Sequence, residues 1–177
     1  FVWPDLGVAS FLSIGRLRPV HTNTIFWGFA SEAMLGLAYY VVPRTSGREL
    51  FSYRLGWLAF GLILAAVVVG NACLITGITN GAQEYREYVW PAMALFAAGL
   101  VLSTYNFYRT VASRRTREIY ISNWYIIAAL IWTTPTVMIS YLPFYQRELG
   151  HTVHQDSSLP QGVGLWFPPM QLGLPSS

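Results

Sequence analysis

Four long apolar stretches constrain this chain more than any other feature of its sequence. They run over Val20–Val42, Leu55–Ile78, Tyr88–Tyr108 and Ile119–Leu142, and short polar segments connect them. A helix needs about 20 predominantly apolar residues to cross a bilayer, and each stretch is long enough. The composition agrees, because only 11% of the residues are charged, against about 25% in soluble domains. The sequence therefore predicts an all-α membrane protein, a transmembrane helix bundle with about four spanning helices.

The C-terminal part of the sequence does not continue this pattern. An apolar patch at Val163–Leu174 is too short to span and contains Pro168 and Pro169, which interrupt a regular helix. We expect a transmembrane bundle portion over residues 1–150 and a polar tail rich in Pro and Gly over residues 151–177. The tail would hold a degenerate start of a further helix. The sequence begins without Met and has no secretory signal, so we expect a processed or partial chain.

The arginines predict how the helices are oriented. If all four stretches span, the first and third connections share one side, which holds Arg44, Arg48, Arg54, Arg109, Arg114, Arg115 and Arg117. The other side has fewer arginines and several acidic residues. By the positive-inside tendency, the arginine-rich side is cytoplasmic. The net charge is only +3, so the arginines indicate topology and not nucleic-acid binding.

The segment Gly15–Asn23, with the sequence GRLRPVHTN, carries the strongest candidate for a functional site. Pro19 suits the first turn of a helix, so His21 would lie about one turn into the membrane, with Arg16 and Arg18 just outside it. A neutral His is a strong ligand for haem iron, and Arg pairs well with carboxylates such as haem propionates. The alternative is that the histidine hydrogen-bonds a neighbour while the arginines anchor to lipid headgroups.

Two residues further along this helix are predicted to lie near the face of His21. At about 100° per residue, Gly28 returns to nearly that face, and Glu32 returns to within about 20° of it near mid-membrane. Gly28 would leave room for a flat macrocycle or serve an ordinary helix contact. A carboxyl at such depth must be protonated, paired or beside water. Glu32 is therefore either a station in a proton relay or a neutral acid that hydrogen-bonds another helix.

Other residues could bind metal ions. Glu84 and Glu87 lie in a polar loop at helical spacing and are hard oxygen donors for Ca²⁺, although such pairs more often begin a solvated helix. His151 and His154 form an H-x-x-H motif, but their polar surroundings favour a solvated tail. Cys73 lies in an apolar run, so we expect its side chain to pack as a small apolar group without a chemical role. The sequence contains no phosphate loop, dinucleotide fingerprint or cysteine cluster, which argues against soluble enzyme classes.

Four motifs in one order resemble subunit I of cbb3-type cytochrome c oxidases, the C family of haem-copper oxidases. The stretch Gly15–Thr22 resembles the start of that subunit's second core helix, and Tyr39–Thr45 resembles its cytoplasmic exit. Glu84–Glu87 looks like the acidic outer loop, and Ile119–Trp124 is similar to a Y-V-A-N-W segment. The resemblance covers about residues 3–150. Nitric oxide reductases share the fold but fit the first and last of these motifs less well.

The resemblance implies roles for several residues. His21 matches an axial ligand of low-spin haem b, and Arg16 and Arg18 match contacts to the haem propionates. A glutamate of the acidic loop, either Glu84 or Glu87, matches one that helps to hold Ca²⁺ between the propionates.

The resemblance also implies an activity. The complete subunit would take electrons from c-type cytochrome subunits through haem b. It would reduce O₂ at a centre of haem b3 and copper, with proton translocation, in the inner membrane of a bacterium. The second haem b ligand, the haem b3 ligand and the copper ligands belong to later segments of the family, and the first copper-binding His would fall near Pro160, where no His stands. Glu32 stands where the family has a neutral residue, so the resemblance gives it no role. Rival interpretations are nitric oxide reduction and a transporter or assembly component without haem.

Overall fold

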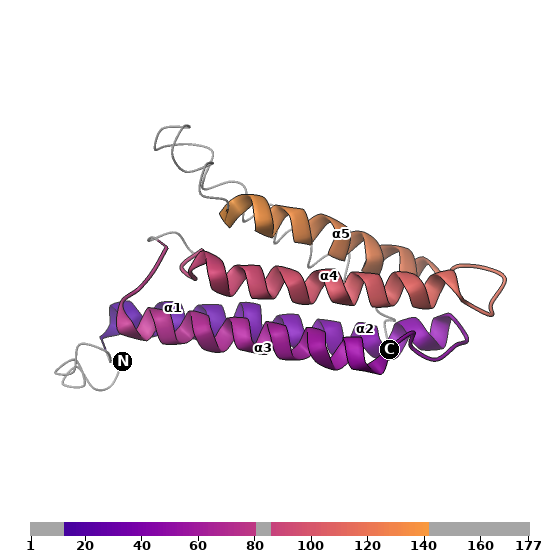
Figure 1. Ribbon diagram of the computed structural model, residues 1–177, viewed down its shortest axis with the longest axis horizontal. Helices are drawn as coiled ribbons and strands as arrows, with labels where there is room; N and C mark the ends of the chain where they lie inside the picture. Colours follow the sequence, from indigo (N-terminus) through magenta and orange to yellow (C-terminus); the bar gives the residue numbers. More distant parts are fainter. Residues whose placement is uncertain (1–12, 81–85, 142–177) are drawn as a thin grey trace.

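The computed structural model describes residues 13–80 and 86–141 as a bundle of long helices, with no strand in those ranges. Along the chain the helices are α1 (Ile14–Asn23), the π-helical segment η3 (Thr24–Ala30), α2 (Ser31–Thr45), α3 (Tyr53–Thr76), α4 (Trp90–Ala112) and α5 (Ile121–Tyr141). The first three form one rod, and successive rods run in opposite directions (Figure 1). The predicted all-α membrane fold is confirmed. Glu84, His151, His154 and the predicted tail lie outside the described residues.

The four predicted apolar stretches are four helical rods. Two of the rods, Ile14–Thr45 and Tyr53–Thr76, are long and apolar enough to cross a membrane by length and composition. At about 1.5 Å per residue, the 23 residues of α4 and the 21 residues of α5 also extend over more than about 30 Å. The α5 helix continues through Pro135. All four rods are therefore long enough for the hydrocarbon core of a bilayer.

The first rod begins earlier than the sequence predicts. Pro19 lies inside α1 and not in its first turn, because the helix already starts at Ile14. The backbone carbonyl of Ser13 accepts hydrogen bonds from two amides of that first turn, at 2.9 and 3.0 Å. A tertiary contact also fixes this turn, since the Arg16 Nη1 donates to the backbone carbonyl of Ile75 at the end of α3, at 2.9 Å. Arg16 and Arg18 therefore lie on the same helix as His21.

The π-helical segment η3 changes which residues share a face of the first rod. A π-turn holds one residue more than an α-turn, so later side chains are rotated by about 100° relative to a continuous α-helix. His21 precedes the segment and is exposed, whereas a side chain at Gly28 would meet Val67 of α3 at 3.4 Å. The expectation that His21, Gly28 and Glu32 share one face is therefore wrong. Gly28 serves a helix contact.

The core of the bundle lies where α4 packs against the other rods. On the side of η3, the Trp27 ring meets the Phe96 ring edge-on, with centroids 5.0 Å apart. Where α4 crosses α3, Gly99 packs so closely that an added Cβ would lie 2.6 Å from Ile63 Cγ1 and 3.0 Å from the Ala59 carbonyl oxygen. Small residues at such crossings let two helices approach closely.

Replacing Gly99 by Ala should therefore loosen the contact between α3 and α4. We expect the free energy of unfolding in detergent to fall by about 1–3 kcal/mol, the usual cost of overpacking a close contact. Gly61→Ala is the matched control, because no atom lies within 4 Å of a Cβ added there. The control should be neutral or stabilising by up to about 1 kcal/mol, since Ala favours a helix over Gly. Equal effects of the two substitutions would contradict the close packing.

The two connections predicted on the arginine-rich side do lie together at one end of the bundle. Arg48 of the α2–α3 connection donates from Nη1 to the carbonyl of Ser113, which follows α4, at 2.9 Å. The backbone N–H of Arg115 donates to the Ser46 carbonyl at 3.0 Å. The arginines of these two connections are therefore gathered at one end of the described bundle. We call this end the arginine-rich end and the opposite end the His21 end.

Candidate functional site

His21 lies on an open face of the first rod, near its start. The imidazole is exposed, and no residue in the described part of the chain hydrogen-bonds it. One turn before and one turn after it, the apolar side chains of Leu17 and Ile25 are also exposed, at 40% and 48%. The described helices therefore leave the imidazole accessible, with one apolar side chain a turn away on each side.

The two arginines before His21 line a pocket at the same end of the bundle. This pocket has a volume of about 660 Å³, and Arg16, Arg18, Thr79 and Glu87 all contribute to its wall. One guanidinium nitrogen of Arg16 is engaged by the Ile75 carbonyl. A guanidinium has five N–H donors, so this bond leaves others for an anionic group. The pocket thus brings together three of the residues that the sequence singles out.

Glu87 is buried at the edge of this pocket, with only 8% of its surface exposed. Its carboxylate Oε2 accepts a hydrogen bond from the Asn23 side-chain amide at 2.9 Å, and that amide also donates to the Pro19 carbonyl at 2.8 Å. Asn23 is completely buried. It therefore joins the helix of His21 to the segment that precedes α4. The sequence alone did not assign this role to Asn23. The signal that could have indicated it is a polar Asn two residues after His21, at the start of an apolar stretch.

A second polar chain joins the start of η3 to the same segment. The Tyr88 hydroxyl donates to Asn71 Oδ1 at 2.8 Å, and the Asn71 amide donates to Thr24 Oγ1 at 2.8 Å. Gly70 makes room for this arrangement, because a Cβ there would lie 2.6 Å from the Tyr88 ring. Tyr88 is buried, whereas the hydrogen bond between Asn71 and Thr24 lies at the surface of the described helices. These hydrogen bonds connect α3 to the π-helical segment close to His21.

Glu32 lies away from this end of the molecule and faces other neighbours. It is half-buried and lines a pocket of about 440 Å³, together with Tyr39 of α2 and residues of α3 and α4. Its Oε1 is buried and has no hydrogen-bond partner among the described residues. The described helices therefore give no support to the interpretation of Glu32 as a neutral acid bonded to a neighbouring helix.

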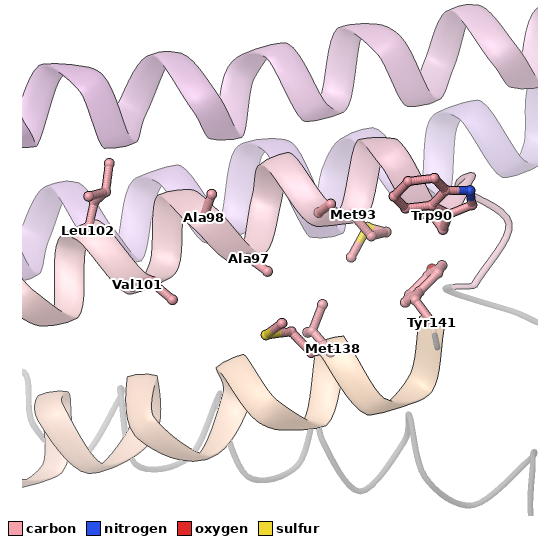
Figure 2. A pocket seen from close by; sticks show the side chains of 10 residues that line it. Trp90, Met93, Ala97, Ala98, Val101, Leu102, Met138 and Tyr141 are labelled. Carbon is pink, nitrogen blue, oxygen red and sulfur yellow. The ribbon is translucent and has the colours of Figure 1, made fainter. Parts of the chain in front are cut away.

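A third pocket, between α4 and α5, has no His, Cys, Asp or Glu among its lining residues. It has a volume of about 620 Å³ and is lined by apolar side chains, among them Met93, Ala97, Val101 and Met138 (Figure 2). Such a surface offers packing and almost no hydrogen-bonding groups. Among the described residues no group of three His, Cys, Asp or Glu comes close enough to hold a metal ion. His21 is therefore the strongest metal-binding candidate in the described part of the chain.

Comparison with known proteins shows the family of this chain. The model of the family "Cytochrome C and Quinol oxidase polypeptide I" matches residues 1–167. The chain belongs to this family. Members of this oxidase subunit I family generally bind haem and copper, and they are membrane proteins, as the fold of this chain also indicates.

Three relatives from the oxidase subunit I family illustrate the similarity. The chain is 34% identical over 122 residues to cytochrome c oxidase subunit 1 of Rhodobacter capsulatus, over 68% of this chain and 23% of the relative. It is 32% identical over 130 residues to the cbb3-type cytochrome c oxidase subunit CcoN1 of Stutzerimonas stutzeri, over 73% of this chain and 27% of the relative. A cytochrome c oxidase subunit 1 homolog of Agrobacterium tumefaciens is 30% identical over 129 residues, with 73% and 24% covered. The chain spans about a quarter of the length of these oxidase subunits.

Proposed function

We propose that this chain is the part of a cbb3-type oxidase subunit I that binds low-spin haem b, with His21 as one axial ligand of the iron. The observation that carries the proposal is the placement of an accessible imidazole one turn along the helix from Arg18, at the end of the bundle where Arg16 and Glu87 line a polar pocket. Similarity to a cbb3-type subunit supports the choice of oxidase class.

The residues present suit a haem in three respects. An imidazole without a competing hydrogen bond is a good iron ligand. Leu17 and Ile25 offer apolar contact next to it. Arg16 and Arg18 would hold the propionates by charge-assisted hydrogen bonds, because a guanidinium matches the geometry of a carboxylate. When bound, the haem supplies one-electron chemistry, and the protein supplies ligation, burial and electrostatics.

We propose a Ca²⁺ site next to the propionates, held by Glu84 or Glu87. Ca²⁺ binds six to eight oxygen ligands, and a buried carboxylate is among its preferred donors. Glu87 supports this assignment because it is buried and shares the pocket with both arginines.

The activity of the complete protein follows as part of the proposal. Electrons from c-type cytochrome subunits would pass through haem b to a centre of haem b3 and copper, which would reduce O₂ and drive proton translocation. The protein would be a multi-pass protein of a bacterial inner membrane, with its arginine-rich end on the cytoplasmic side. That orientation is supported by the seven arginines in the first and third connections and in the helix ends next to them, namely Arg44, Arg48, Arg54, Arg109, Arg114, Arg115 and Arg117.

Purification of the complete complex from its membrane tests the proposal. We expect a reduced-minus-oxidised spectrum with a six-coordinate haem b, together with copper in the metal analysis and consumption of O₂ with reduced cytochrome c. A complex that reduces nitric oxide in place of O₂ would move the chain to the related reductases. A complex without haem would exclude both and favour a transporter or an assembly component.

A further inference from the structure

The side chain of Glu32 is half-buried in the wall of a pocket between helices. Its Oε1 is buried and accepts no hydrogen bond within the described part of the chain. The surrounding wall is mostly apolar and includes Leu35, Trp57 and Phe60. A charged carboxylate in such surroundings is costly unless water or a proton reaches it. The Glu32 carboxylate would therefore be stabilised by binding a proton.

A second pocket lies next to that of Glu32, at the arginine-rich end. This pocket of about 750 Å³ is lined by polar and charged residues, among them Arg44, Arg48, Glu49 and Arg115. It adjoins the pocket of Glu32, because Tyr39 and Tyr53 line both. We call these two shared tyrosines the neck between the inner pocket, which Glu32 lines, and the outer pocket.

Gly56 packs closely against this neck. A Cβ added at Gly56 of α3 would lie only 3.3 Å from Cε1 of Tyr39. The Tyr39 hydroxyl donates to Ser103 Oγ of α4 at 3.1 Å, so a proton-carrying group stands inside the neck. Tyr39 and Tyr53 are the other titratable residues lining the inner pocket, and no arginine among the described residues lines it. The neck is therefore uncharged but holds hydroxyl groups that can pass a proton.

We propose that Glu32 is a reversible proton-binding site that exchanges protons with the arginine-rich end through the neck of Tyr39, Gly56 and Tyr53. A proton adds to a carboxylate oxygen to give the neutral acid and leaves by the same route, so no oxidant or other reactant is needed. The inference rests on the proposed function only for what the proton serves, which is the supply of protons to an oxidase. The site itself is defined by the pocket and the neck.

Infrared spectroscopy of the complete complex in its membrane identifies the proton on Glu32. We expect a carboxylic acid C=O band at neutral pH that is lost in Glu32→Gln. Glu49→Gln is the matched control, because Glu49 is exposed and lines the outer pocket, and it should retain the band. A complex in which Glu32→Gln leaves every such band unchanged would overturn the proposal.

Transfer of the complex into D₂O tests the route. The band should shift as deuterium replaces the proton, and in Gly56→Leu this exchange should slow by about tenfold or more, a rate change equivalent to about 1.4 kcal/mol of barrier. Gly61→Leu is the control on the same helix, because no atom lies within 4 Å of a Cβ at Gly61. Tyr39→Phe keeps the ring, removes the hydroxyl and covers the case in which Gly56→Leu does not assemble.

Slower exchange in Gly56→Leu or in Tyr39→Phe, relative to Gly61→Leu, supports the route. Unchanged exchange in both would overturn it. These measurements need neither haem b ligation nor turnover. A normal haem b spectrum with a negative infrared result therefore rejects the proton site alone, whereas a complex without haem that still shows the Glu32 band rejects the oxidase and keeps the site.

Discussion

Replacing His21 by Ala should abolish the six-coordinate haem b signal in the optical spectrum of the purified complex. The imidazole is the only nitrogen ligand that the described part of the chain places on an accessible apolar face. Loss of a metal's outer-shell partner alone typically costs about 10–100-fold in affinity, so loss of a direct ligand should lower haem b occupancy by more than about tenfold. The measurement is the reduced-minus-oxidised spectrum together with the haem content per subunit.

The other histidines of the chain provide the control for this experiment. His151 and His154 are predicted to lie in a solvated tail, so a variant with both replaced by Ala should keep the haem b spectrum. An intact six-coordinate spectrum in His21→Ala would refute the ligand assignment. Loss of the signal in the control would mean that the tail, and not only α1, is required for haem binding.

Replacing Asn23 by Ala should destabilise the His21 end of the bundle by about 2–4 kcal/mol. The Asn23 amide is the donor to the buried Glu87 carboxylate, at 2.9 Å. Without it, a buried carboxylate loses a hydrogen bond, and leaving such a group unsatisfied costs more than the bond itself contributes. We expect the loss as a lower free energy of unfolding in detergent, and as a weaker haem b signal because Asn23 lies two residues from His21.

A double-mutant cycle with Glu87→Gln isolates this contact. If the two side chains act together, the double variant should be destabilised by less than the sum of the single variants, with a coupling of about 1–3 kcal/mol. Thr136→Val serves as a reference for removing a polar group, because the Thr136 hydroxyl is exposed and bonds only within its own helix, to the Trp132 carbonyl at 2.8 Å. Additive effects within about 0.5 kcal/mol would show that Asn23 and Glu87 act independently.

The sequence was sufficient to predict the four long helices and to predict which connections lie at the same end of the bundle. The length of an apolar stretch decides whether it can span, and this property is local, so all four rods were predicted. The pairing of the two arginine-rich connections also follows from chain order, because alternate connections of an up-and-down bundle share a side. His21, Arg16 and Arg18 could be singled out for the same reason, since each is an ionisable side chain close to the start of a span.

The relation between His21 and Glu32 could not be read from the sequence. A fixed rotation of about 100° per residue assumes an unbroken α-helix, whereas η3 inserts a π-turn between them. Interactions from outside the segment hold that turn, namely the Asn71 bond to Thr24 and the Phe96 ring against Trp27. Both partners are distant in sequence, so no pattern within the first rod could indicate them.

The sequence by itself determined which segments enter the membrane, which end gathers the arginines and which histidine is the metal-ligand candidate, because these depend on local composition and order. The tertiary structure decided that the first rod begins at Ile14 and that Asn23 joins Glu87. It also decided that Glu32 lines a pocket that shares Tyr39 and Tyr53 with a pocket at the arginine-rich end. These features arise from side chains on different helices. Their positions are set by how closely the rods pack, and glycines such as Gly56 and Gly99 control that distance.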